Sequence, residues 1–350
     1  MAENSADQGS TDQGSSFPWQ PGTATGIGSL PGTDPLAAAR TVVTELPDFP
    51  HLAELPGRGP GADMIGRSAG LLVDIAVETT PRGWRLSPER PGKDMRRAKS
   101  LLSHDLDALE EVLDGYRGLL KVQAAGPWTL AAALEQPHSL KLALADPGAV
   151  ADLTASLAEG LAAHVAEVAK RVPGARMVVQ LDEPTLPAAI DGAIPTPSGL
   201  SRIRAVDEEI VRARLRTVRA AVSQHYTVVH CCAEAVPFAI IRGVGADGVS
   251  FDLSLLRNAG LDALAETAEA GLGLLFGIPS TPERVPQKLA LSVAEAWHRM
   301  GLPPSTCAPQ VVITPACGLA GMSPADADAT LRRVREAARI LPEIMEERHS

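Results

Sequence analysis

The feature that most constrains the fold is an alternation of short apolar runs, which end at glycine, proline or polar residues, with longer amphipathic runs. The predicted strands lie at residues 23–28, 51–54, 119–124, 176–181, 225–231, 247–252, 272–277 and 310–314. The predicted helices lie at residues 34–46, 93–115, 139–171, 205–223, 234–242, 258–270, 283–299 and 323–346. Such an alternation is typical of βα units in a parallel sheet, and eight units predict an α/β fold, a (β/α)8 TIM barrel of one domain.

The composition sets the domain boundaries. Hydrophobic residues make up 45% of the 350 residues and aromatic residues only 3%, so the predicted core is large and aliphatic. Residues 1–20 are polar and rich in Ser, Gly and Gln, so they cannot bury enough surface to offset the entropy of ordering. We therefore expect a disordered tail over residues 1–20 and a single barrel domain over residues 21–348.

Charge and hydropathy exclude several classes of function. The chain has 32 Lys and Arg against 42 Asp and Glu, a net charge of −10, which disfavours nucleic acid as the main partner. No apolar run is long enough to span a membrane, and no signal peptide is recognisable, so we expect a cytoplasmic protein with no membrane partner. Four cysteines are too few for a disulfide scaffold in a chain of this length, so reduced thiols are expected.

The motif VVHCC at the end of the fifth predicted strand points to a metal ion. His230 and Cys232 are two residues apart, so both side chains lie on one face of the strand, while Cys231 points to the other. Cys317, in TPACGLAG after the last strand, would lie on the same rim of the barrel. Nitrogen and sulfur ligands of this kind suit Zn²⁺ with one open position. The alternative is a pair of buried thiols and a hydrogen-bonded histidine.

Two further motifs lie where strands end. In QLDEP (residues 180–184) the adjacent Asp182 and Glu183 cannot both face inward, so one is expected to face the pocket and the other to orient the loop. A solvated acidic turn is the alternative. The glycine-rich segment TGIGSLPGTD (residues 25–34) could offer backbone N–H groups to a carboxylate, although such segments often serve only as turns.

Six motifs together resemble a known family. IGSLPGTD, ELPGRGPGADMIGR, GPWTL, QLDEP, VVHCC and TPACGL occur in the order and approximate spacing of the C-terminal catalytic barrel of cobalamin-independent methionine synthase. The resemblance spans about residues 22–345. It implies a (β/α)8 barrel that uses zinc to activate the thiol of homocysteine for methyl transfer. It also implies that His230, Cys232 and Cys317 are zinc ligands.

The same resemblance implies the residues that bind the substrate. Ile27, Gly28 and Ser29 match the segment that holds homocysteine, and Glu54 and Asp182 match the carboxylates that recognise its amino acid group. Buried carboxylates would pair with the substrate ammonium and orient the substrate.

The chain also departs from the family. Asp252 stands where the family has a zinc-binding glutamate one methylene longer, so it ligates directly, binds through water, or does not bind. The segment LFGIPSTPER has no histidine where the family has its proton donor, and PTLPAAI replaces the family's acidic folate contact. The second, N-terminal barrel of full-length relatives is not in this sequence. These departures favour a corrinoid protein or another methyl donor over folate.

The sequence therefore predicts a zinc-dependent methyltransferase, similar to vitamin-B12-independent methionine synthase, that converts homocysteine to methionine. Asp182 and Glu183 are the predicted catalytic carboxylates. One alternative is a zinc-dependent thiol alkyltransferase of the epoxide-opening type. Another is a barrel that binds a thiol or amino acid without catalysis. A decarboxylase of the uroporphyrinogen type fits less well, because it needs no zinc-binding cysteines.

Overall fold

The centre of the molecule is a parallel sheet of six regular strands in the order β3-β5-β6-β7-β8-β9. The computed structural model describes residues 16–89, 91–279 and 285–347. The strands are β3 (Gly118–Ala125), β5 (Ala175–Asp182), β6 (Tyr226–Cys231), β7 (Gly248–Asp252), β8 (Gly273–Ile278) and β9 (Val311–Pro315). Each coincides with a strand predicted from the apolar runs, and their register places Asp182 beside His230 and His230 beside Ser250.

The first two predicted strands, at residues 23–28 and 51–54, are not regular strands, and this corrects the sequence-based expectation. They pair with the sheet only through the isolated parallel bridges Ala24↔Ile313, His51↔Lys121 and Ser29↔Glu54. Glycine and proline in and around these segments weaken a continuous ladder, because glycine orders at a high entropic cost and proline has no N–H group to donate. The bridges still join β9 to β3, so the sheet closes into a barrel.

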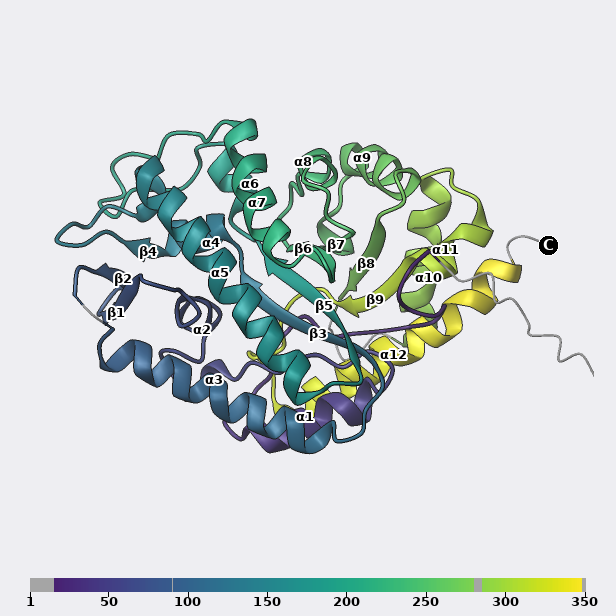
Figure 1. The fold of residues 1–350 in the computed structure, drawn as a ribbon. Helices are drawn as coiled ribbons and strands as arrows, with labels where there is room; N and C mark the ends of the chain where they lie inside the picture. The colour runs from purple at the N-terminus through teal and green to yellow at the C-terminus, as the bar shows by residue number, and fades with distance from the viewer. Residues whose placement is uncertain (1–15, 90, 280–284, 348–350) are drawn as a thin grey trace, which may run out of the picture.

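Helices surround the barrel (Figure 1). Each of the eight predicted ranges contains a helix: α1 (Pro35–Glu45), α3 (Lys93–Val112), α5 (Pro147–Arg171), α7 (Glu208–Ala221), α8 (Phe238–Gly243), α9 (Asn258–Glu269), α10 (Pro286–Arg299) and α12 (Pro324–Glu347). The helix predicted over residues 139–171 begins only at Pro147, because Asp146 caps it and the 3-10 helix η2 (Ala143–Ala145) precedes it. Several begin as their sequences predict. Asp34 accepts hydrogen bonds from the N–H groups of Leu36 (2.9 Å) and Ala37 (3.2 Å), and Pro35 occupies the first turn. Among the helices of the described residues, none is long and apolar enough to cross a membrane.

The structure adds elements that the sequence pattern did not reveal. Short helices α2 (Met64–Ala69), α4 (Pro127–Ala133), α6 (Leu186–Ile190) and α11 (Pro304–Gln310) interrupt the connections. Strands β1 (Ala76–Thr80), β2 (Gly83–Ser87) and β4 (Leu134–Glu135) form a separate small sheet at one side of the barrel (Figure 1). Cys307 lies in α11 and is fully buried.

An aromatic cluster closes the end of the barrel where the strands begin. Trp19 is 1% exposed and packs against Phe49 and Tyr226, and its indole N–H donates to the carbonyl of Pro309 at 3.1 Å. A Cβ atom on Gly273 would lie 2.4 Å from the Trp19 ring, so this position must remain glycine. The predicted disordered tail therefore extends too far. Residues 16–20 are described and Trp19 belongs to the core, whereas residues 1–15 lie outside the described residues.

Candidate active site at the barrel rim

The two predicted cysteine ligands meet at the rim of the barrel. Cys232 directly follows β6 and Cys317 follows β9, and their Sγ atoms are 3.8 Å apart. A hydrogen bond from the Cys232 thiol and a second one from His230 lower the pKa of Cys317 to about 4. The structure thus brings together three side chains that are up to 87 positions apart in the chain.

His230 is fixed by a neighbour on the next strand. Its Nδ1 atom lies 2.9 Å from the Oγ atom of Ser250, which is fully buried on β7. In a metal-binding histidine, one ring nitrogen commonly forms a hydrogen bond to a neighbouring group. Here Nδ1 has that role, which leaves Nε2 for the metal. Ser250 was not recognised from the sequence. Its position in register with His230 on the next strand is the signal that could have identified it.

The donor types and the sulfur spacing fit zinc. Two sulfur ligands of one tetrahedral zinc ion, each about 2.3 Å from the metal, lie about 3.8 Å apart. The Cys232 and Cys317 sulfur atoms have this separation. In the described part of the chain, no group of three or more His, Cys, Asp and Glu side chains already forms an arrangement that could hold a metal ion. The fit therefore depends on the sulfur pair and the oriented imidazole.

Asp252, considered above as a fourth ligand, forms hydrogen bonds to a residue that follows it in the chain. Its Oδ1 atom accepts hydrogen bonds from the backbone N–H of Ser254 at 2.8 Å and from the Ser254 hydroxyl at 2.6 Å. It thereby caps the short 3-10 helix η3 (Leu253–Leu255). The segment with no histidine proton donor continues into residues 280–284, which lie outside the described residues.

The residues predicted to hold the substrate lie beside the sulfur pair. Backbone hydrogen bonds join Glu54 N–H to the Gly28 carbonyl (3.1 Å) and Leu319 N–H to the Ser29 carbonyl (2.8 Å). A Cβ atom on Gly318 would lie 2.1 Å from the Ser29 hydroxyl, so the loop after Cys317 packs directly on Ser29. The segment that contains Ser29 therefore borders both Glu54 and the predicted zinc ligands.

Polar side chains inside the barrel support this arrangement. Lys121, which is fully buried, donates from Nζ to the Ile27 carbonyl at 2.6 Å and to Gln180 Oε1 at 2.8 Å. Gln180 donates in turn to Asp182 Oδ1 at 2.7 Å. The sequence analysis missed Lys121 and Gln180. The signal was available, because each stands two positions from another inward-facing polar residue on its strand (Gln123 and Asp182).

Burial shifts the titration of this interior network. It raises the pKa of Asp182 to about 7, although the nearby His230 opposes the change. Burial likewise raises the pKa of Glu54, whose Oε1 accepts a hydrogen bond from Gln123 at 3.0 Å. The pKa of Lys121 is lowered to about 8 by burial, against the attraction of Asp182 and Glu54. Two carboxyl groups and one amine are therefore held in a water-poor interior, which is where an amino acid ligand can be oriented.

Glu183 has a different position from the one expected of a catalytic group. It is fully buried, and its carboxylate accepts hydrogen bonds from the backbone N–H groups of Trp128 (3.0 Å) and Thr129 (2.8 Å) and from the Thr129 hydroxyl (2.8 Å). These contacts hold the N-terminus of α4. A Cβ atom on Gly126 would meet Glu183 Oε1 at 2.3 Å, so glycine is required there. Of the two adjacent carboxylates, only Asp182 belongs to the interior network.

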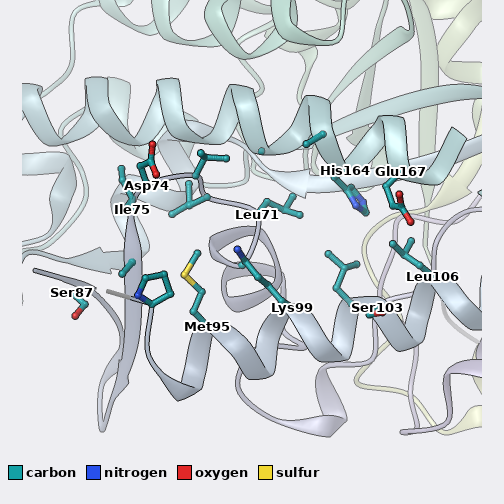
Figure 2. Close-up of a pocket in the computed structure, with 18 of the residues that line it drawn as sticks. Leu71, Asp74, Ile75, Ser87, Met95, Lys99, Ser103, Leu106, His164 and Glu167 are labelled. Carbon is teal, nitrogen blue, oxygen red and sulfur yellow. The ribbon is translucent and has the colours of Figure 1, made fainter. Parts of the chain in front are cut away.

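A cavity of about 990 Å³ lies away from this site, between α3, α5 and residues 70–76. Figure 2 shows His164 and Glu167 of α5 facing Met95, Lys99 and Ser103 of α3 across it. None of the residues predicted for catalysis, substrate binding or metal binding lines this cavity. We therefore place the candidate site at the rim, where those residues converge.

The fold and the rim together define a (β/α)8 barrel with a site of thiol, imidazole and carboxylate groups where the strands end. A family model described as cobalamin-independent synthase, catalytic domain, matches residues 139–340, more than half of the chain. The chain therefore belongs to the cobalamin-independent synthase catalytic domain family. No curated protein matches the chain.

One solved structure supports the fold. A B12-independent methionine synthase from Shewanella sp. W3-18-1, described in complex with selenomethionine, aligns with a TM-score of 0.62 at 13% identity. The alignment covers 93% of this chain and 99% of that chain. The catalytic core of xylanase A aligns with a TM-score of 0.41 at 12% identity, over 85% of this chain and 87% of that chain. At these identities the comparison with the Shewanella protein supports the barrel fold alone.

Proposed function

We propose that this barrel is a zinc-dependent methyltransferase that activates a small thiol, homocysteine, and converts it to methionine. The observation that carries the proposal is the Cys232 and Cys317 sulfur pair, 3.8 Å apart, next to the oriented imidazole of His230. His230, Cys232 and Cys317 would hold the zinc ion. When bound, zinc would lower the pKa of the substrate thiol so that the thiolate is present at neutral pH.

The remaining residues bind and orient the substrate. Asp182 and Glu54, both buried at the rim, pair with the substrate ammonium, and the segment from Ile27 to Ser29 borders the substrate chain. The hydrogen bond from Lys121 to the Ile27 carbonyl holds that segment in place. In the reaction the sulfur–methyl bond forms as the bond between the methyl group and its donor breaks, and the thiol proton is released.

For the donor, we propose a corrinoid protein or another non-folate methyl donor. Support comes from the segment after Glu183, where the chain forms the short helix α6 with the sequence LPAAI. This helix has no carboxylate at the position where the resemblance implies a folate contact. Assays with methylcobalamin and with methyltetrahydrofolate as donors separate the two cases, because only the first is expected to support turnover.

Metal analysis of the purified full-length chain tests the zinc ligands. The unmodified chain is expected to hold about one zinc ion, whereas Cys232→Ala, Cys317→Ala and His230→Ala lose most of it. Cys231→Ala and Cys307→Ala are matched controls, because both thiols are buried and neither is in the proposed ligand set, and both variants are expected to retain zinc. Absence of zinc from the unmodified chain, or equal retention in all five variants, contradicts the proposal.

X-ray absorption at the zinc edge tests the thiol substrate. Homocysteine is expected to add a third sulfur to the two supplied by the chain, and methionine is not. An unchanged sulfur number with homocysteine contradicts thiol activation. A third sulfur with no methyl transfer from any donor supports the non-catalytic binding barrel, and turnover with epoxides instead supports the alkyltransferase alternative.

A further inference from the structure

A second cavity, separate from the rim site, lies between the N-terminal ends of α5 and α7 beside α4. It encloses about 720 Å³, within the range of small-molecule binding sites. Trp128 of α4 forms part of its wall, and the Trp128 indole N–H donates to the Val211 carbonyl of α7 at 3.4 Å. None of the residues assigned to the zinc site or to the substrate lines this cavity.

The lining carries an excess of positive charge. Lys141, Arg202, Arg204 and Arg214 border the cavity, and Asp207 is the one acidic residue in its described lining. The Asp207 carboxylate is already engaged, because it accepts a hydrogen bond from the Glu209 N–H at 2.8 Å at the start of α7. The charge of this lining is therefore opposite in sign to the net charge of the chain, which is −10.

In the described part of the chain, these four cations lack ion-pair partners. Lys141, Arg202 and Arg204 are exposed, and within the described residues none of the four side chains makes an ion pair or a hydrogen bond. Of the four, only Arg214 has a buried group without a hydrogen-bond partner, its Nε–H. Arg212, on the same helix, instead pairs with Glu208 at 2.9 Å and with Glu209 at 2.7 Å. A buried donor without a partner costs free energy, which a bound anion would recover.

The rest of the lining is apolar. Leu144, Val150 and Ile203 are buried, and Ile210 is 46% exposed, an unusual position for a large aliphatic side chain. The first turns of α5 and α7 both border the cavity, and the N-terminal end of a helix favours negative charge. An apolar wall with cations around it fits a ligand that is apolar at one end and anionic at the other.

We propose that this cavity binds a small anionic ligand with an apolar body, held through carboxylate or phosphate groups by Arg204, Arg214 and their neighbours. The site does not depend on the proposed methyl transfer, because it shares no residue with the zinc and substrate groups. Helix α4 connects the cavity to the rim site. The backbone N–H of Trp128 in α4 donates to Glu183, which is adjacent to Asp182 in the chain.

Calorimetry on the full chain tests the proposal with phenyl phosphate and benzene-1,3,5-tricarboxylate as probes. Both anions are expected to bind saturably and more weakly as salt is added, and neutral phenol is not expected to bind. Arg204→Gln and Arg214→Gln are each expected to weaken binding about tenfold. Arg212→Gln changes the net charge equally but lies outside the cavity lining, so it is expected to leave the affinity unchanged.

The apolar part of the site has its own test. Ile210→Ser, at a half-exposed position, is expected to weaken the binding of phenyl phosphate and to leave the affinity for inorganic phosphate unchanged. The tighter of the two aromatic probes identifies the preferred anionic group. The proposal is overturned if neither aromatic anion binds, or if Arg212→Gln weakens binding as much as Arg204→Gln and Arg214→Gln do. Equal affinity for phenyl phosphate and inorganic phosphate overturns the claim that the cavity binds an apolar part of the ligand.

Discussion

Residues at the rim have different roles even where they are adjacent in sequence. Asp182 and Glu183 follow one another at the end of β5, yet Asp182 faces the barrel interior and Glu183 holds α4. Side chains on an extended segment alternate between two faces, so neighbouring carboxylates are separated into two environments. The motif itself indicated that separation, but only the family resemblance assigned Asp182 to the substrate, and both carboxylates were still predicted to be catalytic.

Asp182 is expected to act on the substrate ammonium. Asp182→Asn keeps the shape of the side chain and the hydrogen bond from Gln180 but removes the negative charge, so we expect the KM for homocysteine to rise about tenfold or more with a smaller change in kcat. Steady-state kinetics measure this split. The control substrate is 4-mercaptobutanoate, which lacks the amino group. An equal rise in KM for homocysteine and for 4-mercaptobutanoate would contradict a role of Asp182 in binding the ammonium group.

His164 is expected to make stability depend on pH. Burial lowers the pKa of His164 from 6.5 to about 3, and the charge of Arg67 adds to the effect. The folded state therefore keeps the imidazole neutral, while the unfolded state takes up a proton below pH 6.5. The stabilising contribution is complete above pH 6.5 and is lost as the pH falls toward 3, with a slope of at most about 1.4 kcal/mol per pH unit.

Urea unfolding at several pH values measures this effect. His164→Leu is expected to flatten the loss of stability between pH 6 and pH 4, and His104→Leu, at an exposed position of α3, is not. His51 is also buried, with its pKa lowered to about 3, so part of the acid sensitivity remains in the His164 variant. Identical pH profiles for the unmodified chain and His164→Leu would refute this prediction.

At the scale of elements, α4 shows how one side chain positions a helix. Glycine and proline begin this short helix, and its first N–H groups bond to Glu183, which lies 54 positions later than Thr129. The helix then forms a wall of the second cavity through Trp128. A carboxylate far along the chain therefore holds the start of this seven-residue helix, which is too short to be stable alone.

Removing that carboxylate is expected to loosen α4. Glu183→Ala leaves two buried N–H groups without an acceptor, so we expect the free energy of unfolding in urea to fall by about 3 kcal/mol. Glu183→Gln retains one acceptor oxygen and is expected to lose less. If both variants keep kcat, the role of Glu183 is structural. A large loss of kcat in Glu183→Gln with unchanged stability would instead restore the catalytic role predicted from the sequence.

At the scale of the whole molecule, the barrel separates stability from chemistry. The aromatic cluster around Trp19 fills one end, where β6 and β8 begin, and the candidate site occupies the other end, where β6 and β9 end. In barrels of this kind the end at which strands begin serves stability, while the end at which they finish serves function. Substitutions at the two ends are therefore expected to have different consequences.

Trp19→Ala tests this separation. Removal of a buried tryptophan is expected to lower the free energy of unfolding by about 3–5 kcal/mol while the KM for homocysteine stays unchanged. Phe17→Ala, at a partly buried position that stacks on Trp19, is expected to cost less. The measurements are urea unfolding and steady-state kinetics. A marked rise in KM for Trp19→Ala would show that the two ends are coupled.

The sequence by itself determined the alternation of strands and helices, the parallel barrel, and the placement of His230, Cys232 and Cys317 where strands end. These features follow from local periodicity, which each segment carries in its own residues. Tertiary structure alone decided that residues 23–28 and 51–54 join the barrel through single bridges, that Trp19 belongs to the core, and that Glu183 supports α4. Those outcomes depend on contacts between residues far apart in the chain, and the pattern of any one segment does not encode them.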